Sequence, residues 1–207
     1  MTTDDALAMA WGSAGSPRAL GDGDRLASSF DLMAAVLNGI GLPEALTLVA
    51  TRARSIACTP LAFIALPIED GNTLRVDVAV GTGGDRILGL TVRRGRSMIG
   101  RAFSSRRALS SRIADDQVLS GLPPGPILML PLDTGEATRG VLSVIGRPGA
   151  SPFSTATARE LLLFADMSAR LIELSEERHS AAPTSTARIP GPAHGSVHVL
   201  HPPTAQA

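Results

Sequence analysis

Two pairs of short apolar segments constrain the fold of this chain more than any other feature. The first pair, residues 61–68 and 74–80, reads LAFIALPI and LRVDVAV, with the turn-forming EDGN between them. The second pair reads ILMLPL and GVLSVIG, and the turn-rich residues 133–139 separate its members. Apolar runs of this length, bounded by Gly, Asn and Asp, are typical of β-hairpins. We therefore expect a sheet built from two hairpins.

Segments with helical periodicity flank the two hairpins. Apolar residues three and four apart predict a short helix near residues 30–40. A second helix is expected over residues 43–57, where Pro43 suits the first turn. After the second hairpin, Ser154 is a good N-cap for a long helix that ends near residue 178.

The stretch between the hairpins contains weaker signals. LGLTVRR predicts a third strand, and SMIGRAFSSRR predicts a short helix with Ile99, Ala102 and Phe103 on one face. A fourth short strand is expected over residues 109–113. The predicted order is two helices, a hairpin, a strand, a short helix, a strand, a second hairpin and a long helix.

Composition and length indicate one globular domain with polar ends. The chain has 207 residues, of which 44% are hydrophobic and 18% charged, with a formal net charge of +0. Residues 1–28 and the Pro-, Ser- and Ala-rich residues 179–207 are expected to be disordered, which leaves residues 29–178 as the domain. The acidic start MTTDDALAMAWGSAG lacks the basic and apolar regions of a signal peptide. We expect a cytoplasmic location and no membrane partner.

These elements resemble a GAF domain in order and in wording. LPIEDGNTLRVDVAVGTG is similar to the hairpin of that family, RRGRSMIGRAFSSRRAL to its glycine-flanked short helix, and residues 125–174 to its closing hairpin and helix. The chain resembles the GAF domains of bacterial sensor histidine kinases and GAF-antitermination regulators. The resemblance implies an α+β, PAS-like fold with a central, mostly antiparallel sheet of about five or six strands and the N- and C-terminal helices on one face.

The resemblance also implies a regulatory role. Domains of this family hold a small molecule between the sheet and its covering loops. We therefore expect a stand-alone module that senses a small molecule or docks a signalling partner in bacterial signal transduction or gene regulation. A dimerisation or scaffold protein without a ligand is the alternative. The side chains expected to line a ligand pocket are Phe63, Met98, Ile113, Leu122 and Met129.

Residue types for catalysis or cofactor binding are scarce. Some relatives bind haem through a histidine before the second hairpin, but all four histidines here lie at residue 179 or later, so we expect no haem, other cofactor or metal site. Cys58 is the single cysteine and is expected to act as a small apolar residue entering the first strand, because methionine sulfoxide reduction needs several thiols. Neither Ser97 nor Ser143 lies in a G-x-S-x-G elbow. We expect no catalytic residue and no enzymatic activity.

An arginine-rich stretch is the main charged feature. Seven arginines and no acidic residue occur between residues 93 and 112. A solvated surface is the simplest interpretation. Arg93, Arg94, Arg96 and Arg101 could also attract an anion or an acidic partner protein. A nucleic-acid partner is not expected, because this stretch has one aromatic residue, Phe103, where base stacking would need several.

The terminal helices carry more apolar residues than one sheet can easily cover. In the family these helices form the dimer contact, so the resemblance predicts a homodimer. The residues expected on these dimer helices are Phe30, Met33, Leu37, Leu161, Ala165, Ser168, Leu171 and Ile172.

Overall fold

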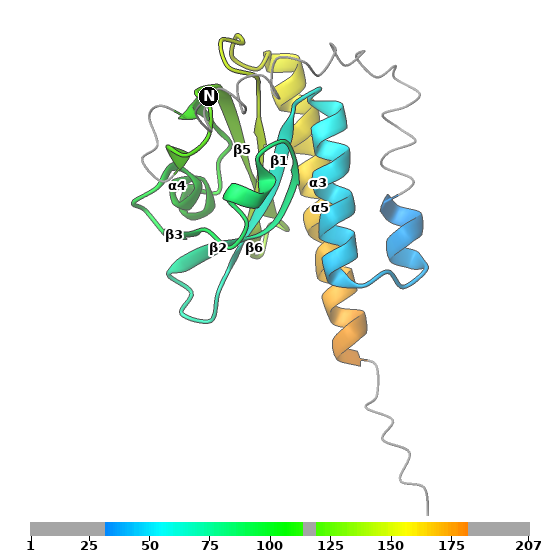
Figure 1. Ribbon diagram of the computed structural model, residues 1–207. Coiled ribbons are helices and arrows are strands. Elements are labelled where there is room, and N and C mark those ends of the chain that lie inside the picture. The colour runs from blue at the N-terminus through cyan, green and yellow to red at the C-terminus, as the bar shows by residue number, and fades with distance from the viewer. Residues whose placement is uncertain (1–31, 114–118, 182–207) are drawn as a thin grey trace, which may run out of the picture.

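The computed structural model describes residues 32–113 and 119–181 (Figure 1). The predicted arm at residues 1–28 lies outside the described residues, and so does the predicted tail from residue 182 onward. Residues 179–181, which the sequence assigned to the tail, are instead the last turn of a helix. The predicted boundary at residue 178 is therefore slightly early, as is common for helix ends.

The core of the fold is a six-stranded, fully antiparallel sheet with the order β3-β2-β1-β6-β5-β4. Its strands are β1 (Leu61–Pro67), β2 (Thr73–Gly81), β3 (Thr91–Arg93), β4 (Leu109–Arg112), β5 (Pro126–Asp133) and β6 (Thr138–Ile145). The two predicted hairpins are β1–β2 and β5–β6, and they join through the β1–β6 pair. The α+β class and the antiparallel sheet are thus confirmed.

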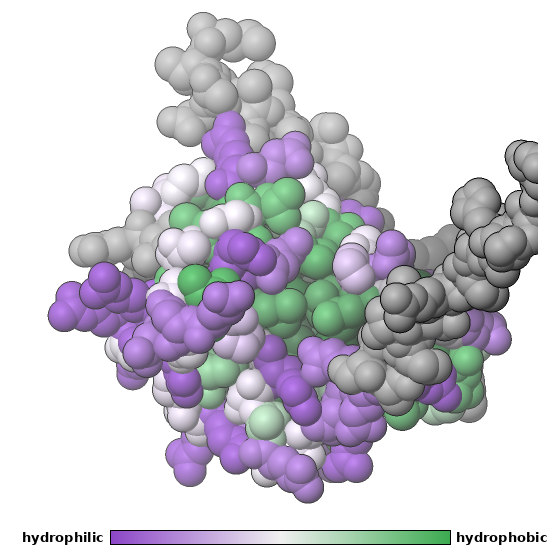
Figure 2. Space-filling model, turned by 90° about the horizontal axis from the view of Figure 1, so that it is seen from below, coloured by the Kyte–Doolittle hydropathy of each residue, from purple (hydrophilic) through white to green (hydrophobic). Residues whose placement is uncertain are grey.

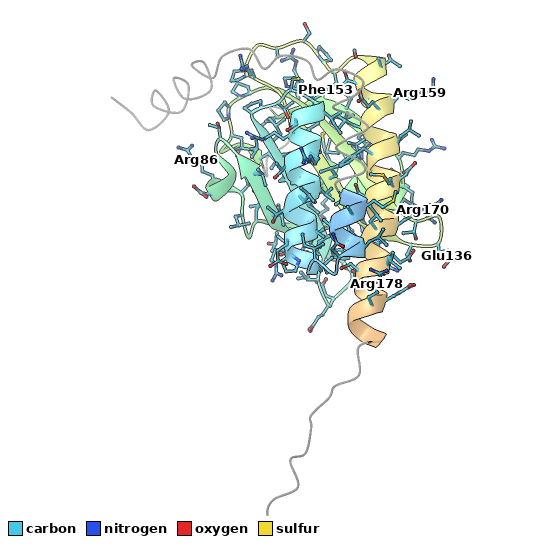
Figure 3. The ribbon with its side chains drawn as sticks, turned by 90° about the vertical axis from the view of Figure 1, so that its right-hand side faces the viewer. Arg86, Glu136, Phe153, Arg159, Arg170 and Arg178 are labelled. Atoms are coloured by element: carbon cyan, nitrogen blue, oxygen red, sulfur yellow. The ribbon has the colours of Figure 1, made fainter. Side chains whose placement is uncertain are left out.

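Helices cover both faces of the sheet (Figure 1). On one face lie α3 (Leu42–Ile56) and α5 (Thr155–Ala181), and the helical residues 32–37 pack beside them (Figure 3). On the other face lie α4 (Met98–Ser105) and the 3-10 turn η1 (Gly84–Arg86). The terminal helices therefore share one face, as predicted.

Local signals explain where these helices begin. The Ser154 hydroxyl accepts a hydrogen bond from the Thr157 backbone N–H at 3.1 Å, and the Ser97 hydroxyl accepts one from the Gly100 N–H at 3.0 Å. Both satisfy an N–H that the helix itself leaves without a partner. Pro43 occupies the first turn of α3, as expected from its fixed φ.

Alternation along the strands divides the interior into two apolar clusters, because successive side chains point to opposite faces. The helix-side cluster packs Ala62, Ile64, Leu128, Leu130, Leu142 and Val144 against α3 and α5. The α4-side cluster packs Leu61, Phe63, Ala65, Ile127, Met129, Val141 and Ile145 against α4 and its neighbouring segments. Each large apolar side chain buried in this way contributes about 1.5–3 kcal/mol.

Cys58 does not enter the first strand. It lies in the turn between α3 and β1, is partly exposed, and has φ +51°. The prediction placed it three residues too near the strand, because the chain must first reverse after α3 before β1 begins at Leu61. Among the described helices, none is long and apolar enough to cross a bilayer.

Candidate functional site

The candidate site is the centre of the sheet face beneath α4. Phe63 of β1 and Met129 of β5 both pair in register with Ser143 of β6, so the serine lies between them. All three side chains have zero exposure to solvent. The middle of this face therefore consists of an aromatic ring, a thioether and a single hydroxyl.

Short segments, rather than long helices, cover this face. Ile99 and Phe103 of α4 pack on it, and Ile113, Leu119 and Leu122 close the adjacent edge. Gly100 allows α4 to lie close to the preceding turn, because a Cβ at that position would be 2.4 Å from the Arg93 carbonyl oxygen. The cover is thus held by an eight-residue helix and two connecting segments.

The Ser143 hydroxyl is the polar centre of this site. Its Oγ is fully buried and forms no hydrogen bond with any described residue. Leaving such a group without a partner costs about 1–3 kcal/mol. A buried polar atom of this kind therefore calls for an explanation. One explanation is that the Ser143 hydroxyl forms its hydrogen bond with a ligand.

The five predicted pocket residues come together in the structure. Phe63, Ile113, Leu122 and Met129 belong to the α4-side cluster, and Met98 packs against it partly buried. The four buried residues have exposed fractions of 0–4%, so side chains fill this space. A ligand would need the cover to move. Their role as ligand contacts stays a prediction.

The expectation of no metal site and no catalytic residue stays a prediction. No group of three or more His, Cys, Asp or Glu residues that could hold a metal occurs in the described parts of the chain. Ser97 is used as the N-cap of α4. The side chain of His179 and the whole of the later histidines lie outside what the structure describes.

The predicted arginine patch separates into arginines with and without intramolecular partners. Arg93, Arg94, Arg96 and Arg101 are all exposed. Arg94 donates a hydrogen bond to the Gly71 carbonyl at 2.7 Å, and its guanidinium lies 4.6 Å from the centre of the Phe103 ring. A cation–π contact of this kind stabilises the cover over the α4-side cluster. Arg94 therefore serves the fold itself.

Arg106 ties the end of α4 to the β5–β6 turn. Its Nη2 donates to the Asp133 carboxylate at 2.6 Å and to the Gly135 carbonyl at 2.6 Å. The hydrogen bond from Arg106, followed by those from the Gly135 N–H and the Thr138 hydroxyl, lowers the pKa of Asp133 from 3.8 to about 2. The carboxylate is accordingly ionised at neutral pH and anchors one end of the cover.

A second ion-pair group connects the sheet to α5. Arg139 of β6 donates hydrogen bonds to Glu173 and Glu176 of α5, the latter at 3.1 Å. Further along α5, Arg178 donates to the Val36 carbonyl at 3.0 Å and so reaches the first helical segment. The strand that carries Ser143 is thus linked to the terminal helices.

The predicted dimer residues require a correction. Leu161, Ala165, Ser168 and Ile172 have exposed fractions of 0–2% within the single chain, because they face α3 and the sheet. They leave no surface for a partner. Leu171 is partly buried against the same cluster.

Exposed apolar side chains do occur elsewhere on the helices. Met33 is 40% exposed and Leu37 is 55% exposed, whereas Phe30 lies outside the described residues. On α5, Leu163 is a large apolar residue that is 65% exposed. The prediction of a homodimer stays a prediction and would rest on this second set.

Comparisons with solved structures identify the architecture. One match is the GAF-B domain of DevS from Mycobacterium smegmatis, with a TM-score of 0.60 and 24% identity over 67% of this chain and 98% of that one. Another is the GAF domain of a phosphoenolpyruvate-protein phosphotransferase from Coxiella burnetii, with a TM-score of 0.62 and 15% identity over 75% of this chain and 96% of that one. This chain has the GAF fold.

A third GAF structure was solved with a bound pigment. It is the phycoerythrobilin-bound GAF domain of a cyanobacterial phytochrome, with a TM-score of 0.63 and 13% identity over 75% of this chain and 97% of that one. Scanning against protein-family models gives no match, and comparison with curated proteins gives none either. The GAF resemblance seen in the sequence is thus confirmed at the level of the fold.

Sequence reasoning missed the importance of Ser143. The sequence offers it only as a candidate nucleophile, and the lack of a G-x-S-x-G elbow argues against that role. The available signal was a polar residue at the centre of the apolar run GVLSVIG, at a position whose alternation points it into the interior. The absence of a hydrogen-bond partner could not be read from the sequence, because it depends on the neighbouring strands.

Proposed function

We propose that this GAF domain is a cytoplasmic sensory module of bacterial signal transduction or gene regulation. It binds a small molecule between the sheet and α4 and transmits the bound state to α5. The observation that carries the proposal is the Ser143 hydroxyl, buried without a partner at the centre of an apolar face. A ligand group that hydrogen-bonds to Oγ would remove the cost of that burial.

The lining favours a small and mainly apolar ligand with one hydrogen-bonding group. Phe63, Met129 and Ile99 provide the apolar contacts, and Met129 can adapt its shape to the ligand. Ligand binding by this architecture has precedent in the phytochrome domain described above. It also has precedent in the free methionine-R-sulfoxide reductase of Neisseria meningitidis, which was solved with its substrate. Cys58 is the single cysteine of this chain, so we do not extend that reductase chemistry to it.

A route for transmission runs along β6. Ser143 and Arg139 lie on this strand, and Arg139 is paired with Glu173 and Glu176 on α5. A shift of β6 on ligand binding would change this ion-pair group and hence the position of α5. The ligand needs a different affinity for the two arrangements for such a shift to occur.

Native mass spectrometry of freshly purified protein tests the proposal directly. A retained small molecule in the wild type, absent from Ser143→Ala, is the expected result. Ser143→Ala should also raise the free energy of unfolding of the ligand-free protein by about 1 kcal/mol, because the unpaired hydroxyl is removed. A variant that is more stable and yet binds less is difficult to explain by misfolding.

Ser168→Ala is the matched control for that experiment. Ser168 is also fully buried, but its hydroxyl donates a hydrogen bond to the Phe164 carbonyl at 2.7 Å and lies on the helix side of the sheet. Its replacement should neither stabilise the protein nor release the ligand. Retention of the molecule by Ser143→Ala, or its loss from both variants, would contradict a site centred on Ser143.

A dimerisation or scaffold role without a ligand is the alternative. The exposed Met33 and Leu37 of the helical residues 32–37 and the exposed Leu163 of α5 favour it. From the end of the molecule where α5 finishes, apolar surface is visible in the middle of a polar surround (Figure 2). We propose that a homodimer forms through this helical layer, both for a ligand-binding sensor and for a scaffold without a ligand. Light scattering should show Leu37→Glu as a monomer, whereas the solvent-facing Leu88→Glu should leave the dimer intact.

A further inference from the structure

A groove on the outer side of α4 is separate from the apolar site. It has a volume of about 430 Å³. The residues that line it are Gly95, Arg101, Ser104, Ser105, Arg107 and Leu109. Arg101, Ser104 and Ser105 are three and four positions apart on α4, so they share one helix face, opposite the buried Ile99 and Phe103.

The two arginines of the groove, Arg101 and Arg107, differ in their side-chain contacts from the arginines close to them in the sequence. Arg94 and Arg106 are engaged by Gly71, Phe103 and Asp133. Arg101 and Arg107 form no side-chain hydrogen bond or ion pair with any described residue. Arg106 has a left-handed backbone conformation, with φ +56°, so the chain changes direction between α4 and Arg107. The groove thus holds two guanidinium groups whose charge no described side chain neutralises.

We propose that this groove binds the phosphate group of a small phosphomonoester. Guanidinium groups donate paired hydrogen bonds that match phosphate oxygens, and the hydroxyls of Ser104 and Ser105 add further donors. The C-terminal end of α4 carries a partial negative charge of about half an elementary charge, which repels an anion. The two full positive charges of Arg101 and Arg107 exceed that opposing partial charge.

The size and lining of the groove determine the class of ligand. A volume of about 430 Å³ fits a phosphate with a small organic body, in the range of ordinary small-molecule sites. None of the lining residues is aromatic, so base stacking of the kind that holds single-stranded nucleic acid is not provided. Leu109 supplies an apolar contact for the organic part of the ligand.

The proposal is tested by NMR titration of the full chain with inorganic phosphate and with O-phosphoserine. Ionic strength is held constant with chloride, because screening alone would mimic competition. We expect saturable shifts at the backbone amides of Gly95, Ser104 and Leu109, with tighter binding of O-phosphoserine. The Arg101→Gln, Arg107→Gln double variant should weaken binding at least about tenfold, as expected for the loss of charge-assisted hydrogen bonds.

A second double variant controls for net charge. Arg159 and Arg170 of α5 are exposed and point away from the body on the opposite face of the sheet (Figure 3). Arg159→Gln with Arg170→Gln removes the same charge and should leave the affinity within about twofold. The proposal is overturned if phosphate gives no saturable shifts, if both double variants weaken binding equally, or if only a long nucleic acid or a phosphopeptide binds. Each of these results would leave the Ser143 site unaffected.

Discussion

Both faces of the sheet carry an apolar cluster, yet the two clusters are covered in different ways. On the helix side, α3 and the 27-residue α5 cover the strands, and the buried Ser168 hydroxyl is satisfied by Phe164. On the other side, the eight-residue α4 and short connections cover them, and the buried Ser143 hydroxyl is left unsatisfied. Long regular elements whose buried Ser168 hydroxyl is paired provide a rigid scaffold. Short segments over an unpaired group leave room for a ligand-dependent change.

The largest expected effect comes from the rigid face. Leu130→Ala removes a fully buried side chain from the helix-side cluster and should lower the free energy of unfolding by about 3 kcal/mol. Chemical denaturation measures the loss, and Leu88→Ala, at a side chain that is 55% exposed, should change it little. A small loss at Leu130 would show that this face is less tightly packed than its zero exposure indicates.

The next effect concerns the attachment of the cover. Gly100→Ala places a Cβ 2.4 Å from the Arg93 carbonyl oxygen, so α4 must move away from the preceding turn. We expect a loss of about 1–3 kcal/mol and faster hydrogen exchange in α4, with α5 unchanged. Gly121→Ala is the control, because nothing lies within 4 Å of its added Cβ. Uniform acceleration across both faces would contradict the separation between them.

Acid should weaken one anchor of the cover selectively. The folded-state pKa of Asp133, about 2, lies below its ordinary value of 3.8, mainly because of Arg106. The stabilisation is therefore complete above about pH 4 and is lost as the pH falls through 2. It amounts to about 1–2 kcal/mol after allowance for solvent screening of the half-exposed Arg106. Denaturation of the wild type and of Asp133→Asn at several pH values measures it, and the two curves should converge at low pH.

The smallest effect on stability is expected at the ion pairs that connect β6 to α5. Arg139→Gln breaks the partly exposed pairs with Glu173 and Glu176 and should cost about 1 kcal/mol or less. If the proposed ligand binds at Ser143, it should still bind to this variant, but its binding should no longer alter hydrogen exchange in α5. An undiminished response of α5 in Arg139→Gln would exclude this ion-pair group as the route of transmission.

Much of the fold was predictable from local sequence. The two hairpins follow from the apolar runs and their turn residues, and Ser154 and Pro43 mark the helix starts at which the structure places them. These features depend on contacts within a few residues, which composition and spacing specify directly. The five proposed pocket residues lie in or against one apolar cluster, and their role as ligand contacts stays a prediction.

The assignment of side chains to partners was less predictable. The stripe Leu161, Ala165 and Ile172 was interpreted as a dimer surface, but α3 and the sheet of the same chain cover it. Amphipathic spacing shows that a face is apolar without showing which element covers it. The arginines of the 93–112 stretch likewise look equivalent in sequence, whereas Arg94 and Arg106 have partners from distant segments.

The sequence by itself therefore determined the order of elements and the alternation of the strands. Only the tertiary structure decided that Ser168 has a hydrogen-bond partner and Ser143 does not. The physical reason is the origin of each contact. A serine in a helix can reach the carbonyl four residues before it, whereas a serine in a strand depends on side chains brought beside it by pairing with other strands.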